Sequence, residues 1–344
     1  MSNITNQSGY FLFSLDTELG WGFYDLDQLR YQIFSPDGSK QREAIERLLD
    51  IFDEFGITAT WAVTGHLFYE KCEECEICPI LDWEGKYRSF EEIYKTQEPL
   101  WYGADIIDNL ISRATLQDIA FHGYTHQLFD EQTMDEDAAK TEVREWLRVS
   151  SRRGILPSTV IFPRNVIGHM KVFEESGFIC YRGREVQPML YRIKFLGKLF
   201  KHLDHIFSFS IPHVYDLNGI SVNGMVNLYS SQDFFGFNRN VEMVLDSINL
   251  DNVRFNRIIK TVKKAANEKK IVHITAHPWE FKTDKDLDKL RYLLGYVVED
   301  ISAGRLQSIG MTELAKKVIS KDIINTKGSK TRNQVSKVPF RLDN

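Results

Sequence analysis

Residues 118–126, Asp118-Ile119-Ala120-Phe121-His122-Gly123-Tyr124-Thr125-His126, combine a predicted strand with a pair of histidines. Apolar residues alternate up to His122, which is typical of a buried strand, and Gly123 then breaks the strand. His126 follows His122 by four residues, a spacing at which two imidazoles can converge on one cation. Chance pairs of this kind are common, so a metal site needs support from the rest of the chain.

The composition is that of a folded soluble protein. The chain has 344 residues, of which 43% are hydrophobic, enough for one large α/β domain or for two ordinary domains. The net charge of −5 gives no electrostatic reason to expect nucleic acid or an anionic membrane as a partner. We identify no secretory signal and no apolar stretch of about twenty residues. We therefore expect a cytoplasmic protein without a transmembrane segment.

Strand and helix patterns alternate along the chain. The predicted strands are residues 10–16, 57–63, 118–122, 157–162, 178–181, 220–228, 270–277 and 305–309. The predicted helices are residues 41–55, 135–153, 171–176, 238–267, 285–302 and 311–320. This alternation favours a parallel sheet, and six or seven such strands are enough to close a barrel. In barrels of this kind the chemistry gathers at the carboxyl ends of the strands.

We predict a single domain over residues 8–320. Residues 66–104 have little periodicity, so we expect a long decorated loop with short helices, of the kind that often lies over an active site. Residues 187–217 are predicted to be irregular, with a basic and apolar segment around 194–201. Residues 325–344 are polar and cannot bury a core, so a disordered tail is expected there.

Ionisable side chains follow several predicted strands. Taken singly, each has an ordinary explanation as a turn or capping carboxylate, a surface arginine or a loop histidine. Four strand ends that carry such groups on one face of a barrel make a shared site the better explanation. The residues concerned are Asp16 and Glu18 after the first strand, His122 and His126 after the third, Arg164 after the fourth, and His277 after a late one.

These residue types suit metal-assisted amide hydrolysis. One carboxylate and two imidazoles form a three-ligand site for a divalent ion, with positions left open for water and substrate. Asp16 and Glu18 can both face the mouth of the barrel, because residues i and i+2 of a strand point the same way. The second carboxylate can take a proton from bound water, whose pKa a metal lowers to roughly 7. Arg164 would hold that carboxylate ionised, and His277 can protonate a leaving amine.

The ordered motifs resemble those of the polysaccharide deacetylases, the carbohydrate esterases that share the NodB homology domain. The resemblance covers roughly residues 10–310 in motif order. It implies a distorted (β/α)7-type barrel and the removal of acetyl groups from acetylated sugars, mostly with a divalent metal. Asp16 matches the base of the first motif. Asp16-Thr17-Glu18 is similar to the acid-x-acid variant of that motif, in which Glu18 is the metal ligand.

The later motifs match with substitutions. His122 and His126 match the second motif, with Gly123 where serine or threonine is usual. Phe162-Pro163-Arg164-Asn165 is similar to the arginine motif with a shifted residue order, and Thr275-Ala276-His277 is similar to the Leu-x-His motif. The resemblance thus implies Asp16, His277 and Arg164 as catalytic residues, and Glu18, His122 and His126 as ligands of a divalent metal, with Zn²⁺ favoured. Arg182 and Arg184 are further candidates for substrate contacts.

We therefore predict a metal-dependent deacetylase, a hydrolase of carbon–nitrogen bonds other than peptide bonds. The expected substrate is an N-acetylated sugar, an intracellular intermediate of surface polysaccharide or O-antigen biosynthesis. Two alternatives stay open. One is a hydrolase of a non-sugar amide such as a ureide. The other is a non-catalytic carbohydrate-binding barrel, in which Trp21, Trp101 and Trp279 stack on sugar rings.

Three of the four cysteines form a compact cluster, Cys72, Cys75 and Cys78. This distribution does not match a secreted disulfide framework. The spacing is typical of zinc or iron–sulfur ligands, with Cys180 or His66 as a fourth ligand, and reduced loop cysteines are the alternative explanation. Reduced loop cysteines are the favoured explanation; if the cluster binds a metal, a structural zinc is favoured over a redox centre. A metalloprotein with a structural or sensing role is a further hypothesis.

Overall fold

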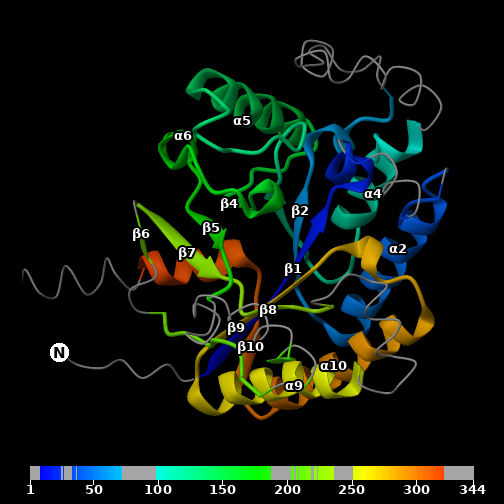
Figure 1. Ribbon diagram of the computed structural model, residues 1–344, viewed down its shortest axis with the longest axis vertical. Coiled ribbons are helices and arrows are strands. Elements are labelled where there is room, and N and C mark those ends of the chain that lie inside the picture. Colours follow the sequence, from blue (N-terminus) through cyan, green and yellow to red (C-terminus); the bar gives the residue numbers. More distant parts are fainter. Residues whose placement is uncertain are drawn as a thin grey trace, which may run out of the picture.

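A curled sheet of parallel strands forms the centre of the molecule (Figure 1). The structure is a computed structural model and describes residues 8–24, 26, 33–35, 37–71, 98–186, 203–204, 207, 209–217, 221–222, 224–235 and 251–320. The strands of the described sheet are β1 (Gly9–Thr17), β2 (Thr60–Val63), β3 (Asp118–Phe121), β4 (Thr159–Val160), β5 (Cys180–Gly183), β6 (Ser221–Val222), β7 (Met225–Tyr229), β8 (Gln232–Asp233), β9 (Ile271–Ala276) and β10 (Leu306–Ser308).

The strand order is β6-β7-β5-β4-β3-β2-β1-β9-β8, with β10 paired to β1. Every neighbouring pair of strands in this sheet is parallel except β6 and β7. The carboxyl ends of the parallel strands therefore lie at one edge, which is where a barrel of this type carries its functional groups. The predicted fold class, an α/β fold with a distorted barrel of parallel strands, is confirmed.

One chain segment joins the two sides of the curled sheet. Residues 225–229 pair with β5, and residues 232–233 of the same segment pair with β9. Between them, the backbone N–H of Ser230 donates to the carbonyl oxygen of Gly183 (3.1 Å), and that of Ser231 donates to the carbonyl oxygen of His273 (2.8 Å). Two successive residues thus bond to opposite sides, which brings the ends of β5 and β9 to one pocket.

The prediction of one strand over residues 220–228 is wrong. The structure divides this stretch into β6 and β7, which pair antiparallel. Gly224 lies between them with a φ of 78°, in the left-handed region that glycine adopts without steric cost. The dipeptide Asn223-Gly224 in the sequence is a favoured hairpin turn, and this signal outweighs the apolar alternation around it.

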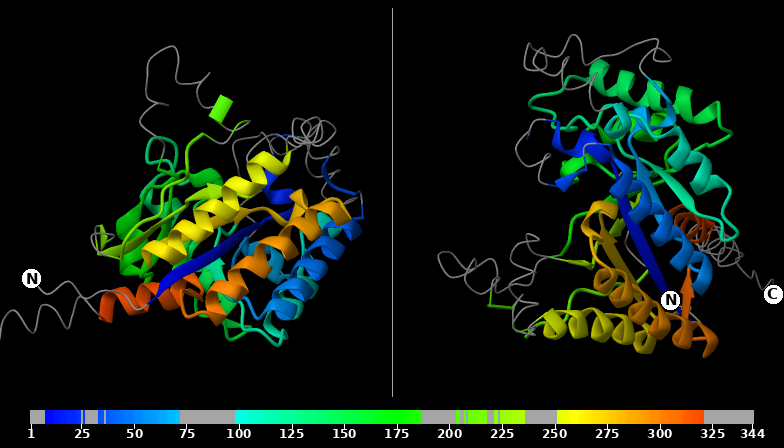
Figure 2. Two further views of the ribbon diagram at one scale, coloured as in Figure 1. Left: turned by 90° about the horizontal axis from the view of Figure 1, so that it is seen from below. Right: turned by 90° about the vertical axis from the view of Figure 1, so that its right-hand side faces the viewer.

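Helices surround the outer face of the sheet (Figure 2). They are α2 (Ser39–Phe55), α4 (Ala104–Ile111), α5 (Glu136–Ser151), α6 (Met170–Glu175), α9 (Asp251–Glu268), α10 (Asp284–Ser302) and a last helix over residues 311–320. Short 3-10 turns occur at η1 (Leu19–Phe23), η2 (Gly65–Phe68), η5 (Glu98–Leu100), η6 (Pro163–Asn165) and η8 (Pro278–Glu280). Contacts run in the order α9, α10, α2 and α4, and α5 contacts α6. Except for α4, these helices match predicted ones.

Several predictions concern residues outside the described ones. These are the clustered cysteines with most of the predicted loop at 66–104, residues 187–202, residues 238–250 of the predicted helix, and the tail at 325–344. A single domain over residues 8–320 stays a prediction. Among the described residues, every helix is too short or too polar to cross a bilayer.

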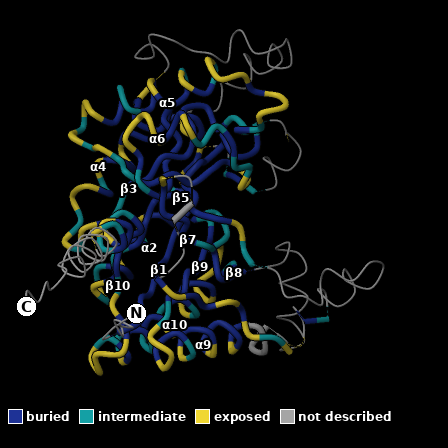
Figure 3. Tube along the Cα trace, turned by 90° about the vertical axis from the view of Figure 1, so that its left-hand side faces the viewer, coloured by how far each residue is buried: buried dark blue, intermediate teal, exposed yellow. Residues whose placement is uncertain are grey.

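The strands at the centre of the molecule are mostly buried (Figure 3), and their two faces build two apolar layers. Phe13 and Phe121 point outward and pack under the helices, whereas Leu12 and Ala62 point inward, as the two-residue period of a strand requires. Met311 and Leu314 of the last helix belong to the inner layer. Further along β1 the inward-facing positions become polar, so the interior is apolar at one end and ionisable at the other.

A buried carboxylate holds the loop that follows β3. Glu142 of α5 accepts hydrogen bonds from the backbone N–H groups of Tyr124 (2.7 Å) and Thr125 (3.0 Å), and from the Thr125 hydroxyl (2.5 Å). Gly123 and His126, at the two ends of this loop, both have left-handed backbones, with φ of 75° and 61°. A positive φ at a histidine costs free energy, so the hydrogen bonds to Glu142 have to fix this path.

Replacement of Glu142 by alanine should destabilise the protein strongly. Glu142→Ala leaves two buried N–H groups without partners, so we expect the free energy of unfolding to fall by roughly 2–5 kcal/mol. Denaturant unfolding measures this change. Glu142→Gln keeps an oxygen that can accept both N–H groups and should recover much of the loss. Glu136→Ala, at an exposed position of the same helix, should cost about 0.5 kcal/mol. An equal effect of Glu142→Ala and Glu136→Ala would contradict this role.

Candidate active site

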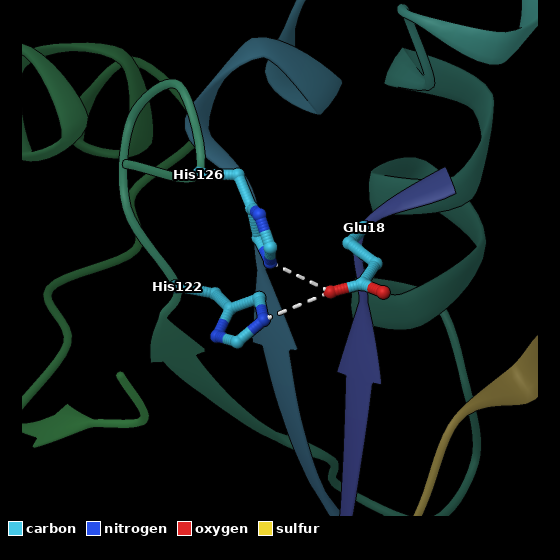
Figure 4. Close-up of side chains that lie close together, drawn as sticks. All are labelled: Glu18, His122 and His126. Atoms are coloured by element: carbon cyan, nitrogen blue, oxygen red, sulfur yellow. Dashed lines mark hydrogen bonds and ion pairs between the residues drawn. The ribbon is translucent and has the colours of Figure 1, made fainter. Parts of the chain in front are cut away.

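Glu18, His122 and His126 converge on one point at the carboxyl ends of β1 and β3 (Figure 4). Glu18 Oε2 lies 3.2 Å from His122 Nε2 and 2.8 Å from His126 Nε2. The candidate ligand atoms all lie within 4.8 Å of one another, and all three side chains are buried. Glu18 directly follows β1, so it shares the inward direction of that strand with Asp16.

The proton position on His122 shows that these residues suit a cation. His122 Nδ1 lies 2.8 Å from the carbonyl oxygen of Ile161. A carbonyl oxygen can only accept, so Nδ1 carries the proton, and a neutral His122 turns the lone pair of Nε2 toward the Glu18 carboxylate. His126 Nε2 is close to the same carboxylate but has no hydrogen-bond alignment with it. Lone pairs that face one another in a buried site call for a positive charge between them.

The pKa shifts of Glu18 and His126 agree with this interpretation. Burial raises the pKa of Glu18, but His126 and His122 outweigh it and hold the pKa of that carboxyl well below its usual value. Burial lowers the pKa of His126, against the opposing effect of Glu18. An ionised carboxylate and neutral imidazoles are the forms that bind a metal, so Glu18, His122 and His126 could hold a divalent ion.

Asp16 is paired with a buried arginine. Arg182 of β5 donates from Nη1 to Asp16 Oδ1 and from Nη2 to Oδ2, both at 2.6 Å. Burial raises the pKa of Asp16. Arg182, and after it His122, lower that pKa by more than burial raises it, so the net pKa is below its usual value. Asp16 Oδ2 also lies 3.9 Å from His122 Nε2 and 3.8 Å from His277 Nε2. Asp16 is therefore an ionised carboxylate between the histidine pair and His277.

Further hydrogen bonds fix the position of Arg182. Its Nη1 donates to Ser14 Oγ (3.2 Å), and its Nη2 donates to Asn165 Oδ1 (3.1 Å). The Ser14 hydroxyl accepts from arginine, so it can donate to His273 Nε2 at 2.8 Å. Burial is the main cause that lowers the pKa of His273, to about 3, and the imidazole stays neutral. The interior of the barrel below Asp16 is thus a connected polar network.

The predicted contact between Arg164 and Asp16 is wrong, because Arg182 makes it. Arg164 lies in η6 with a φ of 48°, is exposed, and its Nη2 donates to the carbonyl oxygen of Gly22 (3.2 Å). Its guanidinium carbon lies 5.8 Å from the ring centroid of Tyr24. Arg182 instead occupies an inward-facing strand position two residues after Cys180. The sequence signal that could have identified Arg182 is a charged residue at an inward-facing position of a strand. A role of Arg164 toward substrate stays a prediction.

His277 follows β9 and is oriented by a residue that the sequence analysis missed. Glu280 Oε2 lies 3.2 Å from His277 Nδ1 and accepts from the His277 backbone N–H at 2.7 Å. Burial lowers the pKa of His277, but Glu280, Glu18 and Asp16 outweigh it and raise that pKa to about 10. Metal-free protein at neutral pH therefore carries a protonated His277 that faces Asp16.

Asp16, Arg182 and His277 line a pocket of about 360 Å³. Its wall includes residues of β5, β9 and η6, which come together because the segment 225–234 joins the two sides of the sheet. The ionisable and amide side chains that line it include Asp16, Arg164, Asn165, Arg182, Arg184 and His277. The candidate catalytic groups therefore have access to a cavity of the size that small ligands use.

Two of the predicted sugar-stacking tryptophans are buried. Trp21 and Trp101 are 1% and 0% exposed, and Trp21 Nε1 donates to the carbonyl oxygen of Trp101 (2.8 Å). They cannot stack on a ligand without unpacking the core, so this part of the carbohydrate-binding hypothesis is wrong. Trp279 is half-buried, with its ring centroid 5.2 Å from that of His277.

The two candidates for a fourth ligand of the cysteine cluster are both buried. Burial raises the pKa of the Cys180 thiol, and its Sγ lies 3.0 Å from Thr159 Oγ1. His66 Nδ1 donates to the carbonyl oxygen of Tyr124 (2.9 Å). Both side chains thus have structural surroundings of their own, and a metal at the cysteine cluster stays a prediction.

The stabilising effect of His277 should depend on pH in metal-free protein. The pKa of His277 is about 10 in the folded protein and about 6.5 in the unfolded chain. Its contribution is therefore complete below about pH 6.5 and is lost as the pH rises through about 10. Thermal unfolding with a chelator should show the largest gap in Tm between wild type and His277→Gln at mildly acidic pH. The gap for His169→Gln, at the start of α6, should be small throughout; a His277 gap that grows with pH would contradict the raised pKa.

Comparisons with known proteins support the fold. No family model matches the chain, and no curated protein matches its sequence. Among solved structures, it is similar to a proposed polysaccharide deacetylase from Mycobacterium smegmatis, with a TM-score of 0.52, 15% identity and 94% of each chain covered. It is also similar to a Puue allantoinase, with a TM-score of 0.51, 12% identity and 91% of each chain covered. At such low identity these likenesses concern the fold alone. The resemblance predicted from the sequence motifs is confirmed at that level: the chain has the fold of the polysaccharide deacetylases.

Proposed function

We propose that the protein is a metal-dependent hydrolase that removes the acetyl group from an N-acetylated sugar. The observation that carries this proposal is the convergence of His122 Nε2 and His126 Nε2 on the buried Glu18 carboxylate, beside Asp16 and His277. Glu18, His122 and His126 would be the metal ligands. The fold likeness to a deacetylase structure supports the same reaction class.

The ligand set favours zinc. Two imidazole nitrogens and one carboxylate oxygen are a donor set that Zn²⁺ accepts while positions stay open for water and substrate. When bound, such an ion acts as a Lewis acid on a carbonyl oxygen and lowers the pKa of a bound water molecule to roughly 7. The protein's own residues then have to move two protons, one away from the water and one to the leaving amine.

Asp16 is the proposed general base. Arg182 holds it ionised and fixes both of its oxygens, so it can accept a proton without a change of side-chain conformation. Its Oδ2 lies 3.9 Å from His122 Nε2, which places it next to the proposed ligands. Arg182 acts through Asp16 and is therefore a positioning residue.

His277 is the proposed general acid. It is protonated before the reaction, and its Nε2 lies 3.8 Å from Asp16 Oδ2 on the pocket side. Glu280 binds Nδ1 and leaves Nε2 to donate a proton to the amine as the carbon–nitrogen bond breaks. A cation bound by Glu18 would offset the carboxylates that raise the pKa of His277 and bring that pKa closer to neutral pH, where proton donation is more effective.

The proposed substrate is a sugar intermediate of surface polysaccharide or O-antigen biosynthesis. A non-sugar amide is the second candidate, because the similar allantoinase structure covers nearly the whole chain. Both reactions use the same residues, so the substrate panel has to separate them. Acetate release from N-acetylated sugars indicates the first reaction, and consumption of allantoin indicates the second.

Metal content and turnover test the proposal together. We expect wild-type protein to hold one equivalent of zinc and to release acetate from N-acetylated sugars. His122→Ala should lose the metal. Asp16→Asn should keep it and lose turnover by roughly 10²–10⁴-fold, as for removal of a general base. Asp105→Asn, at an exposed site on α4, is the matched control and should change neither value.

A wild-type protein that holds no zinc in excess metal would refute the proposal. So would an Asp16→Asn variant that works as fast as wild type. Thermal unfolding of each variant separates loss of function from loss of fold.

A further inference from the structure

One wall of the pocket is rich in arginine although the chain as a whole carries a net charge of −5. Arg164, Arg182 and Arg184 come from η6 and from the end of β5. The opposite wall, from β8 and the end of β9, carries Asp233 and His277. Three arginines thus share the pocket with the carboxylates of Asp16, Glu185 and Asp233.

Asn165 anchors this arginine wall. Arg184 donates from Nε to the Asn165 carbonyl oxygen (2.9 Å), and Arg182 donates from Nη2 to the Asn165 side-chain oxygen (3.1 Å). Arg164 and Asn165 both have left-handed backbones, with φ of 48° and 54°. Two successive non-glycine residues of this kind store strain, which proteins retain mostly at ligand sites. The hydrogen bonds from Arg182 and Arg184 hold that strained turn against the pocket.

Arg182 and Arg184 differ in what remains for a ligand. The Arg182 guanidinium is paired with the Asp16 carboxylate inside the barrel. Arg184 is exposed at the pocket. Its hydrogen bond within the described part of the chain goes from Nε to Asn165. No carboxylate of the described residues pairs with it, although Glu185 lines the same pocket. Its two terminal nitrogens thus form a fork of the shape that binds phosphate or carboxylate.

We propose that this wall binds an anionic group of the substrate, a phosphate or a carboxylate, with Arg184 as the principal contact. This inference rests on the proposed function and narrows its substrate class to acetylated sugars that carry a negative charge. Asp16 and Arg184 line the same pocket, so one substrate molecule can present its acetyl group to the first and its anion to the second. Arg184 is a specificity residue here, because its hydrogen bond goes to Asn165 and not to a proposed metal ligand or to His277.

Paired substrates test the inference. The anionic arms are UDP-N-acetylglucosamine, which carries a diphosphate, and an N-acetylated uronic acid, which carries a carboxylate. The neutral arm is di-N-acetylchitobiose. Wild-type protein should prefer at least one anionic substrate over the neutral one in kcat/KM, and the preferred arm identifies the anion. The preference should weaken as salt is added, because an exposed pair is screened.

Arg184 variants locate the contact. Arg184→Ala should reduce the preference for the anionic substrate about ten-fold, mainly through KM. Arg184→Lys should restore part of it, because the charge returns without the fork. Arg144→Ala, at an exposed site of α5, is the matched control and should leave the preference unchanged. Calorimetric binding of UDP-glucosamine and of glucosaminuronic acid, the deacetylated forms of the two anionic substrates, gives a second readout that needs no turnover.

The outcomes separate this inference from the proposed function. Turnover of the neutral substrate at least as efficient as that of both anionic ones would overturn the inference and leave the deacetylase proposal intact. An Arg184→Ala variant with an unchanged preference would also overturn it. If no substrate is turned over, failure of the wild type to bind both deacetylated probes overturns the inference, and absence of zinc overturns the proposed function.

Discussion

The hydrogen bond from His122 Nδ1 to the Ile161 carbonyl oxygen is the constraint on which the site depends. It places a proton on the side of the imidazole that faces away from Glu18, so that in a neutral His122 a nitrogen lone pair and a carboxylate meet at 3.2 Å in a buried place. Such an arrangement is unfavourable without a positive charge between the two groups. His126 adds a second nitrogen from a loop that Glu142 holds in a left-handed path. The protein thus maintains a cluster of acceptors whose best explanation is a shared cation.

The barrel supports this cluster by a change of polarity along its interior. Leu12 and Ala62 fill the amino-terminal end, and Ser14 and Asp16 follow on the same face of β1. A buried Asp16 would be costly alone, but the bidentate bond from Arg182 and the hydrogen bonds from Arg182 to Ser14 and Asn165 compensate for its burial. The same network holds Asn165, and through it the arginine wall. The proposed general base and the proposed anion contact therefore share one scaffold.

Local patterns in the sequence predict the strands and the residues at their ends. Parallel strands place their carboxyl ends at one edge, so Asp16, Glu18, His122, His126 and His277 had to lie near one another once the fold was right. The partner of Asp16 could not be predicted in this way, because Arg164 and Arg182 both follow strands. Which of the two arginines pairs with Asp16 depends on the inward register of β5 and on the positive φ of Arg164, and both are fixed only in the folded chain. The same holds for Trp21 and Trp101, which are buried through a contact between residues eighty positions apart.

The central claim is that Glu18, His122 and His126 share one ion. A crystal structure of the zinc-loaded protein, with anomalous diffraction data collected on both sides of the zinc absorption edge, tests it most directly. We predict one strong anomalous peak about 2.0–2.2 Å from a Glu18 carboxylate oxygen and from Nε2 of both histidines. A map without a peak at this place, or with the only peak at other residues, would contradict the account.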